Sequence, residues 1–219
     1  MSELGNGGKK RPPFQVEPTD LVDEIMARGH ITPWELFKIV SWKSAKGVAW
    51  LSLNSEEEIE DVTRETVDAL KEWQGPQDVI SAKMTFEDWD SWQADVAQIL
   101  GADKSRTKGG NSTGLLRLHG VGYPVATAIL ALLKPKIFPV MDRWAVVTIF
   151  EEGSSRKQWQ RSAVYRAYAE RLVNPDCPAL ERFTTLRERD KAAMNASMAP
   201  TDNGQLVDGY EKISLPKKL

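Results

Sequence analysis

Residues 115–130 read Leu-Leu-Arg-Leu-His-Gly-Val-Gly-Tyr-Pro-Val-Ala-Thr-Ala-Ile-Leu, and this stretch decides the fold prediction. Two helical patterns meet at the Gly-Val-Gly turn, Gly120 to Gly122, and a proline suited to a first helical turn follows at once. Glycine tolerates positive φ and lets two backbones approach closely. The stretch therefore predicts two helices, over about 112–118 and 124–134, joined by a tight hairpin with Val121 filling the core between them.

The hairpin turn also predicts a binding site for a DNA phosphate. The first N–H groups of the second helix have no partner within that helix and lie at the positive end of its dipole. We expect the DNA-binding loop to be His119, Gly120, Val121, Gly122 and Tyr123. No cofactor is expected, although a monovalent cation at the hairpin is compatible with this arrangement. An ordinary corner between two helices is the competing interpretation.

A carboxylate follows the hairpin after a short apolar segment. The sequence Phe138-Pro139-Val140-Met141 brings Asp142 to the start of a further helix, predicted over 142–151. An aspartate at a helix start can cap backbone N–H groups, and the helix dipole favours its charged form. Asp142 is therefore either a structural cap or a group with a chemical role.

The hairpin and the carboxylate together resemble the helix-hairpin-helix DNA glycosylase superfamily, the group of endonuclease III and the adenine glycosylases, over about residues 115–150. The resemblance implies an all-α, two-lobed fold with Asp142 as the catalytic residue in a cleft between the lobes. There it would stabilise the sugar cation as the N-glycosidic bond of a flipped base breaks. It implies that DNA is the partner and that damaged or modified bases are the substrates, as in base excision repair.

Four departures from the family pattern refine this expectation. Pro124 stands where lyase-competent members carry a lysine, which implies a monofunctional glycosylase. Arg143 and Trp144 replace the residues usual after the aspartate, so we place both at the substrate pocket. His119 stands where a proline is usual. The single cysteine, Cys177, excludes an iron–sulfur cluster within one chain, and no histidine or cysteine spacing predicts another metal site.

Charge is unevenly distributed along the chain, although its net value is only −2. Residues 17–100 contain 18 acidic and 7 basic residues, whereas residues 101–173 contain 12 basic and 5 acidic residues. Lys104, Arg106 and Lys108 lie in the basic part, just before the hairpin, and we predict that they contact DNA. Equally, the two parts could be surfaces of opposite charge that dock on each other.

Helical periodicity and capping signals occur along the whole chain, and no period-2 pattern is sustained, so the predicted fold class is all-α. The predicted divisions are a disordered tail, an acidic helical lobe, a basic hairpin lobe and a C-terminal tail, at 1–16, 17–111, 112–198 and 199–219. Within them we predict helices at about 20–28, 33–43, 56–73, 86–100, 156–173 and 178–193, with a loop around Gly47 and Trp50.

Lys43 ends the predicted helix over 33–43. It is a candidate for the substrate pocket, although a lysine that complements the helix dipole is the simpler interpretation. The chain shows neither a signal peptide nor a membrane span, so we expect a cytoplasmic monomer, associated with the nucleoid in a prokaryote. The rival function is a non-catalytic helix-hairpin-helix DNA-binding protein. A helical protein without a nucleic-acid role is the third alternative.

Overall fold

The structure is a computed structural model that describes residues 16–101, 114–142, 146, 149–150, 161–173 and 178–198. These residues form helices and loops without a β-strand, which confirms the all-α prediction. Among them, no helix has both the length and the apolar character needed to cross a bilayer. The helices are η1 (Thr19–Leu21), α1 (Val22–Arg28), α2 (Pro33–Lys43), α3 (Ala45–Leu51), α4 (Glu56–Lys71), α5 (Phe86–Leu100), η2 (Leu115–Arg117), α6 (Tyr123–Leu133), α9 (Ser162–Val173), α10 (Pro178–Glu181) and α11 (Leu186–Met198).

Local signals set the ends of the N-terminal helices where the sequence predicts them. Thr32 caps α2 in a capping box, in which its hydroxyl accepts from the N–H of Glu35 and the Glu35 carboxylate accepts from the N–H of Thr32. Thr85 caps α5 in the same way. Helices α1 and α5 end at Gly29 and Gly101, whose φ values of 92° and 71° are left-handed and suit glycine.

Three predictions about secondary structure are wrong. The segment around Gly47 and Trp50 is helix α3 rather than a loop. Before the hairpin turn, the described part of the predicted helix is only the single 3₁₀ turn η2. The last predicted helix is divided into α10 and α11, because Thr185 starts a new helix there: its hydroxyl accepts from the N–H of Glu188, whose carboxylate accepts from the N–H of Thr185.

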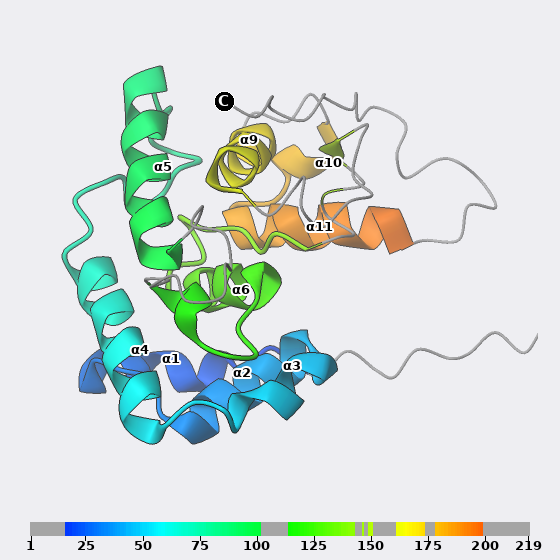
Figure 1. The fold of residues 1–219 in the computed structure, drawn as a ribbon. Coiled ribbons are helices and arrows are strands. Elements are labelled where there is room, and N and C mark those ends of the chain that lie inside the picture. The colour runs from blue at the N-terminus through cyan, green and yellow to red at the C-terminus, as the bar shows by residue number, and fades with distance from the viewer. Residues whose placement is uncertain are drawn as a thin grey trace, which may run out of the picture.

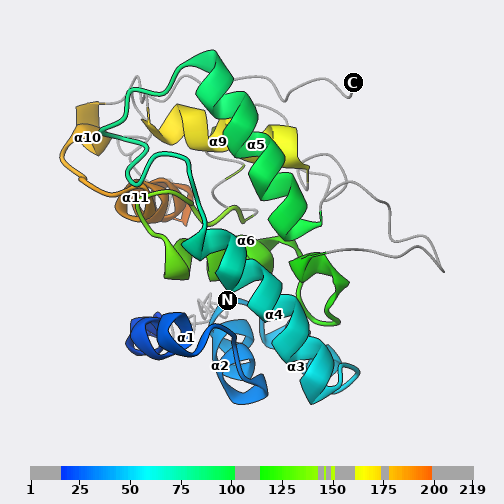
Figure 2. The same ribbon diagram turned by 90° about the vertical axis from the view of Figure 1, so that its left-hand side faces the viewer.

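Helix α6 lies at the centre of the molecule. In Figures 1 and 2 it lies between α1–α3 below and α9 and α11 above, while α4 and α5 run along one side. All of its residues except Pro124 are buried, as expected for a helix surrounded by others. One continuous hydrophobic core extends from Leu21 to Ala193.

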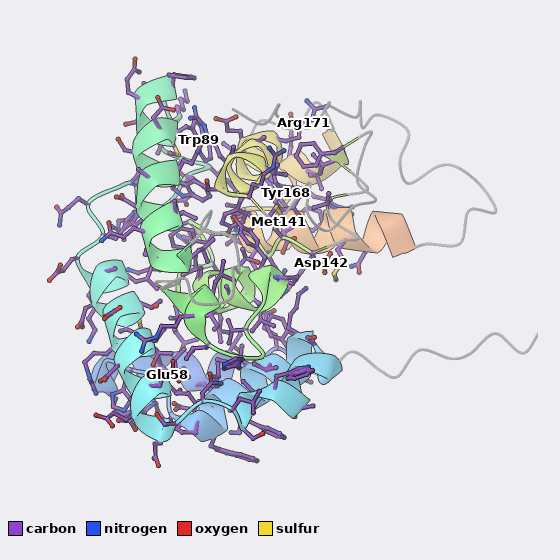
Figure 3. All side chains as sticks on the ribbon, viewed as in Figure 1. Glu58, Trp89, Met141, Asp142, Tyr168 and Arg171 are labelled. Atoms are coloured by element: carbon purple, nitrogen blue, oxygen red, sulfur yellow. The ribbon has the colours of Figure 1, made fainter. Side chains whose placement is uncertain are left out.

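Aromatic side chains fill the core above α6. Trp92 of α5 is buried and lies 5.2 Å from Tyr165 of α9 and 5.8 Å from Phe138, measured between ring centroids. Trp89 packs edge-on against Trp92, and Figure 3 labels Trp89 on the side of α5 that faces α9. Trp89 and Trp92 therefore serve packing, whereas Trp34 and Trp50 are exposed.

The acidic and basic parts of the chain contact each other through ion pairs. Arg117 pairs with Glu58 at 3.2 Å, Lys136 with Asp78 at 3.8 Å, and Arg166 of α9 with Asp90 of α5. Three of the basic residues counted in 101–173 therefore face acidic residues of the preceding part. This agrees with the docking interpretation of the charge pattern, and it leaves fewer cations for DNA.

Candidate functional site

Hydrogen bonds from side chains of three helices hold the segment that carries Asp142. The N–H of Met141 donates to the Thr127 hydroxyl of α6 at 3.1 Å, and the N–H of Val140 donates to the Asp190 carboxylate of α11 at 3.1 Å. The Tyr165 hydroxyl donates to the Pro139 carbonyl at 2.6 Å. Burial raises the pKa of Tyr165 well above its usual range, so this hydroxyl keeps its proton. The segment is therefore fixed immediately before Asp142.

Asp142 stands at the start of a helical turn, as predicted. Its carbonyl accepts from the N–H of Val146 at 3.0 Å, which is the first hydrogen bond of an α-helical turn. Figure 3 shows Asp142 between α6 and α11. The predicted neighbours Arg143 and Trp144 lie outside the described residues.

The side chain of Asp142 forms an ion pair with Lys43, the last residue of α2. Lys43 Nζ lies 2.7 Å from Asp142 Oδ2, and the two side chains are 11% and 14% exposed. An ion pair so far removed from water is screened much less than a surface pair. The structure thus brings together two sequence-predicted site residues that are far apart in the chain.

A second group of charges, which we call the buried charge cluster, lies next to this ion pair. It consists of Glu17, Arg187 and Asp190, together with Lys191, whose side chain is 45% exposed. Asp190 is 1% exposed and pairs with Arg187, which also donates to Glu17 Oε1 at 3.0 Å; Lys191 pairs with the same glutamate. Buried charges are stable only when they are paired. Because Glu17 pairs with two residues of α11, the cluster holds the segment before η1 against that helix.

The pKa of Asp190 links the cluster to the ion pair. Burial raises this pKa, and the nearby charge of Asp142 raises it further. Arg187, a hydrogen bond from the Tyr168 hydroxyl at 2.7 Å and the charge of Lys43 oppose the shift without cancelling it. Asp142, Lys43 and Asp190 therefore share one electrostatic environment.

The hairpin turn differs from the prediction at Gly120. Its φ of 82° is left-handed, and a Cβ there would lie 2.5 Å from the carbonyl oxygen of Gly47 in α3. Gly120 is therefore a packing position against α3 rather than an open approach for a phosphate. Gly122 is different, because a Cβ there would meet only Pro124, at 3.9 Å.

The other residues of the predicted DNA-binding loop differ in how far they are buried. Val121 is buried and fills the core between the flanking segments, as predicted. The Tyr123 side chain is also buried and lies edge-on to Tyr165, so only its backbone is placed to contact a phosphate. His119 is exposed. Lys104, Arg106 and Lys108 lie outside the described residues.

Asn54 holds the hairpin turn in place, although no motif in the sequence points to this residue. Its Oδ1 accepts from the N–H of His119 at 2.7 Å, and its Nδ2 donates to the His119 carbonyl at 3.0 Å. Nδ2 also donates to the Leu51 carbonyl at the end of α3, at 3.0 Å. One amide therefore connects the end of α3 to the backbone of the turn.

Sequence reasoning also missed Arg187 and Asp190, since charged residues on a helix usually face solvent. Their spacing of three residues is compatible with an ordinary exposed pair. Among the described residues, no group of three or more histidine, cysteine, aspartate or glutamate side chains is arranged to hold a metal ion.

Comparisons with protein-family models, with curated proteins and with solved structures found no match to this chain. The interpretation of the site therefore depends on the hairpin, on Asp142 and on the contacts around them.

Proposed function

We propose that this chain is a monofunctional DNA glycosylase-like hydrolase that removes a flipped, damaged or modified base, with Asp142 as its catalytic residue. The observation that carries the proposal is the ion pair between Asp142 and Lys43, because it holds a carboxylate in one orientation in a largely dehydrated position. A charged group held in this way is what the reaction requires.

The chemistry follows from charge. As the base–sugar bond breaks, positive charge develops on the sugar, and a preorganised carboxylate stabilises it most strongly where water is excluded. Extruding a base costs a few kcal/mol, and least for a damaged or mismatched base, so damage is the natural substrate class. Water then completes the hydrolysis, because no lysine occupies the position of Pro124.

The hairpin supports DNA as the partner. The N–H of Gly122 has no hydrogen-bond partner among the described residues, and the space beside its Cα is open. It precedes α6, an 11-residue helix whose dipole attracts anions at this end. A phosphate bound there would need no arginine, which suits a chain with a net charge of −2.

A non-catalytic DNA-binding protein is the alternative function, and one observation favours it. Asp142 Oδ2 already has a partner in Lys43, and little of the side chain is exposed. In that case the ion pair would only connect α2 to the segment after the hairpin, and Asp142 would have no substrate.

The test compares two variants that break the same ion pair, Asp142→Asn and Lys43→Met. Duplexes with a panel of modified bases are incubated with each protein, and alkali then reveals abasic sites. If Asp142 is catalytic, Asp142→Asn should lower base release by about 100-fold or more, far beyond Lys43→Met, with DNA affinity retained. Equal losses would assign the effect to the ion pair. No release by the unmodified protein, or undiminished release by Asp142→Asn, would remove Asp142 from the mechanism.

A further inference from the structure

Asp190 is the one fully buried carboxylate of the described chain that contacts the segment leading to Asp142. It is 1% exposed. Its Oδ1 accepts from the Tyr168 hydroxyl at 2.7 Å, and its Oδ2 accepts from the N–H of Val140 at 3.1 Å and pairs with Arg187. A carboxylate with three donors is fixed in position, and it fixes the backbone two residues before Asp142.

The Asp190 carboxylate is also connected to the Lys43 end of the ion pair, through Arg187. The guanidinium of Arg187 lies 5.7 Å from the ring of Trp42, the residue before Lys43. The charges of both Lys43 and Asp142 act on Asp190. Asp190 therefore contacts the segment before Asp142 directly and reaches the end of α2 only through Arg187.

The charges of this region balance only when Asp190 is included. Lys43, Arg187 and Lys191 supply three positive charges, and Asp142, Glu17 and Asp190 supply three negative charges. Without the charge of Asp190, a mostly buried region would hold one excess positive charge, which is costly at low dielectric. Lys191 is 45% exposed and meets water directly, whereas the Lys43 side chain is only 11% exposed. A loosened ion pair should therefore be detected as faster reaction of Lys43 with a reagent in water.

We propose that Asp190 is a positioning residue that holds Lys43 and Asp142 together, by anchoring the Val140 backbone and by balancing the charge of Arg187. Its effect on base release rests on the proposed function, whereas its effect on the ion pair does not. The two can therefore be tested separately.

The first measurement is independent of activity. The protein is treated with a limiting amount of acetic anhydride, and the acetylation rate of Lys43 is measured by mass spectrometry. Asp190→Asn keeps the shape and removes the charge, so Lys43 acetylation should rise about tenfold, equivalent to about 1.4 kcal/mol. Tyr168→Phe removes one of the three donors to the same carboxylate but leaves the carboxylate itself, so the rise should be smaller than in Asp190→Asn. Lys38, on the same helix, serves as the internal reference.

The double variant Asp190→Asn with Arg187→Met separates charge balance from a general loss of packing. Removing both members of the pair restores neutrality, so Lys43 should again be acetylated as slowly as in the unmodified protein, even if Asp190→Asn alone does not fold. If Asp190 had a purely structural role, Lys43 should be acetylated at least as fast in the double variant as in Asp190→Asn alone. That result, or an unchanged Lys43 rate in folded Asp190→Asn, would overturn the proposal.

Base release is measured on the same proteins. It should fall in Asp190→Asn and fall less in Tyr168→Phe. If the unmodified protein releases no base from any duplex, the proposed function fails, and the acetylation rates still decide the role of Asp190.

Discussion

Gly47 and Gly120 contact each other backbone to backbone. A Cβ on Gly120 would lie 2.5 Å from the Gly47 carbonyl oxygen, and a Cβ on Gly47 would lie 2.7 Å from the Gly120 carbonyl oxygen. Real Cβ atoms do not approach backbone this closely, so neither position accepts a side chain without movement of α3 or of the hairpin turn. The contact separates the two hairpin glycines into one that serves folding and one that is open.

Gly120→Ala and Gly122→Ala should therefore have different effects. Gly120→Ala meets both the left-handed φ of 82° and the Gly47 carbonyl, so we expect a destabilisation of about 1–3 kcal/mol. Gly122→Ala should cost about 1 kcal/mol at most, yet weaken DNA binding by obstructing the phosphate. Urea unfolding and salt-dependent DNA titrations measure the two effects. Equal DNA affinity for Gly122→Ala and the unmodified protein would argue against phosphate binding at the hairpin.

Asn54→Ala should affect the hairpin turn without changing its glycines. The variant removes both hydrogen bonds to His119, and we expect a stability loss of about 1–2 kcal/mol. Because the turn loses its anchor to α3, DNA affinity should fall as well. Asn54→Asp is the matched control, since it retains the acceptor for the His119 N–H but not the donor. If Asn54→Ala binds DNA normally, the turn does not depend on this anchor for binding.

Borohydride should trap no covalent complex between this protein and abasic DNA. Pro124 has no amine, and Lys43, the amine close to Asp142, is an ion-paired ammonium, which is a poor nucleophile. Gel analysis after incubation with borohydride checks the prediction. An adduct that appears with the unmodified protein and is lost in Lys43→Met would contradict the monofunctional assignment and identify Lys43 as the nucleophile.

Acid should destabilise the protein through Glu17. Burial raises its pKa, but hydrogen bonds and charges from Lys191 and Arg187 outweigh burial and hold the pKa below the ordinary value of 4.5. The folded state therefore binds the proton less tightly than the unfolded state, so this stabilisation is present above about pH 4.5 and is lost as the pH falls through the lowered pKa. Urea unfolding across this pH range should show that Glu17→Gln loses less stability in acid than the unmodified protein does.

Glu24→Gln is the control for that experiment, because Glu24 is exposed on α1. Glu24→Gln should lose as much stability in acid as the unmodified protein does. If Glu17→Gln also loses the full amount, Glu17 does not cause this pH dependence.

Contacts within a single helical turn account for the features that could be predicted from the sequence. Thr32, Thr85, Gly29 and Gly101 set helix ends through contacts within one turn, and such contacts can be read from neighbouring residues. The same reasoning located Asp142 at a helix start. It failed at Gly47, where α3 forms against the hairpin, because burial across the chain overrides weak local preferences.

The tertiary structure alone decided what surrounds Asp142. Its partner Lys43 lies at the end of α2, and Asp190 reaches the Val140 backbone from α11. Such contacts depend on how the helices pack around α6. This packing cannot be predicted from the spacing of residues along the chain. The sequence therefore indicated a carboxylate with a choice of roles, and the fold supplied the charges that surround it, because electrostatic interactions act between neighbours in space.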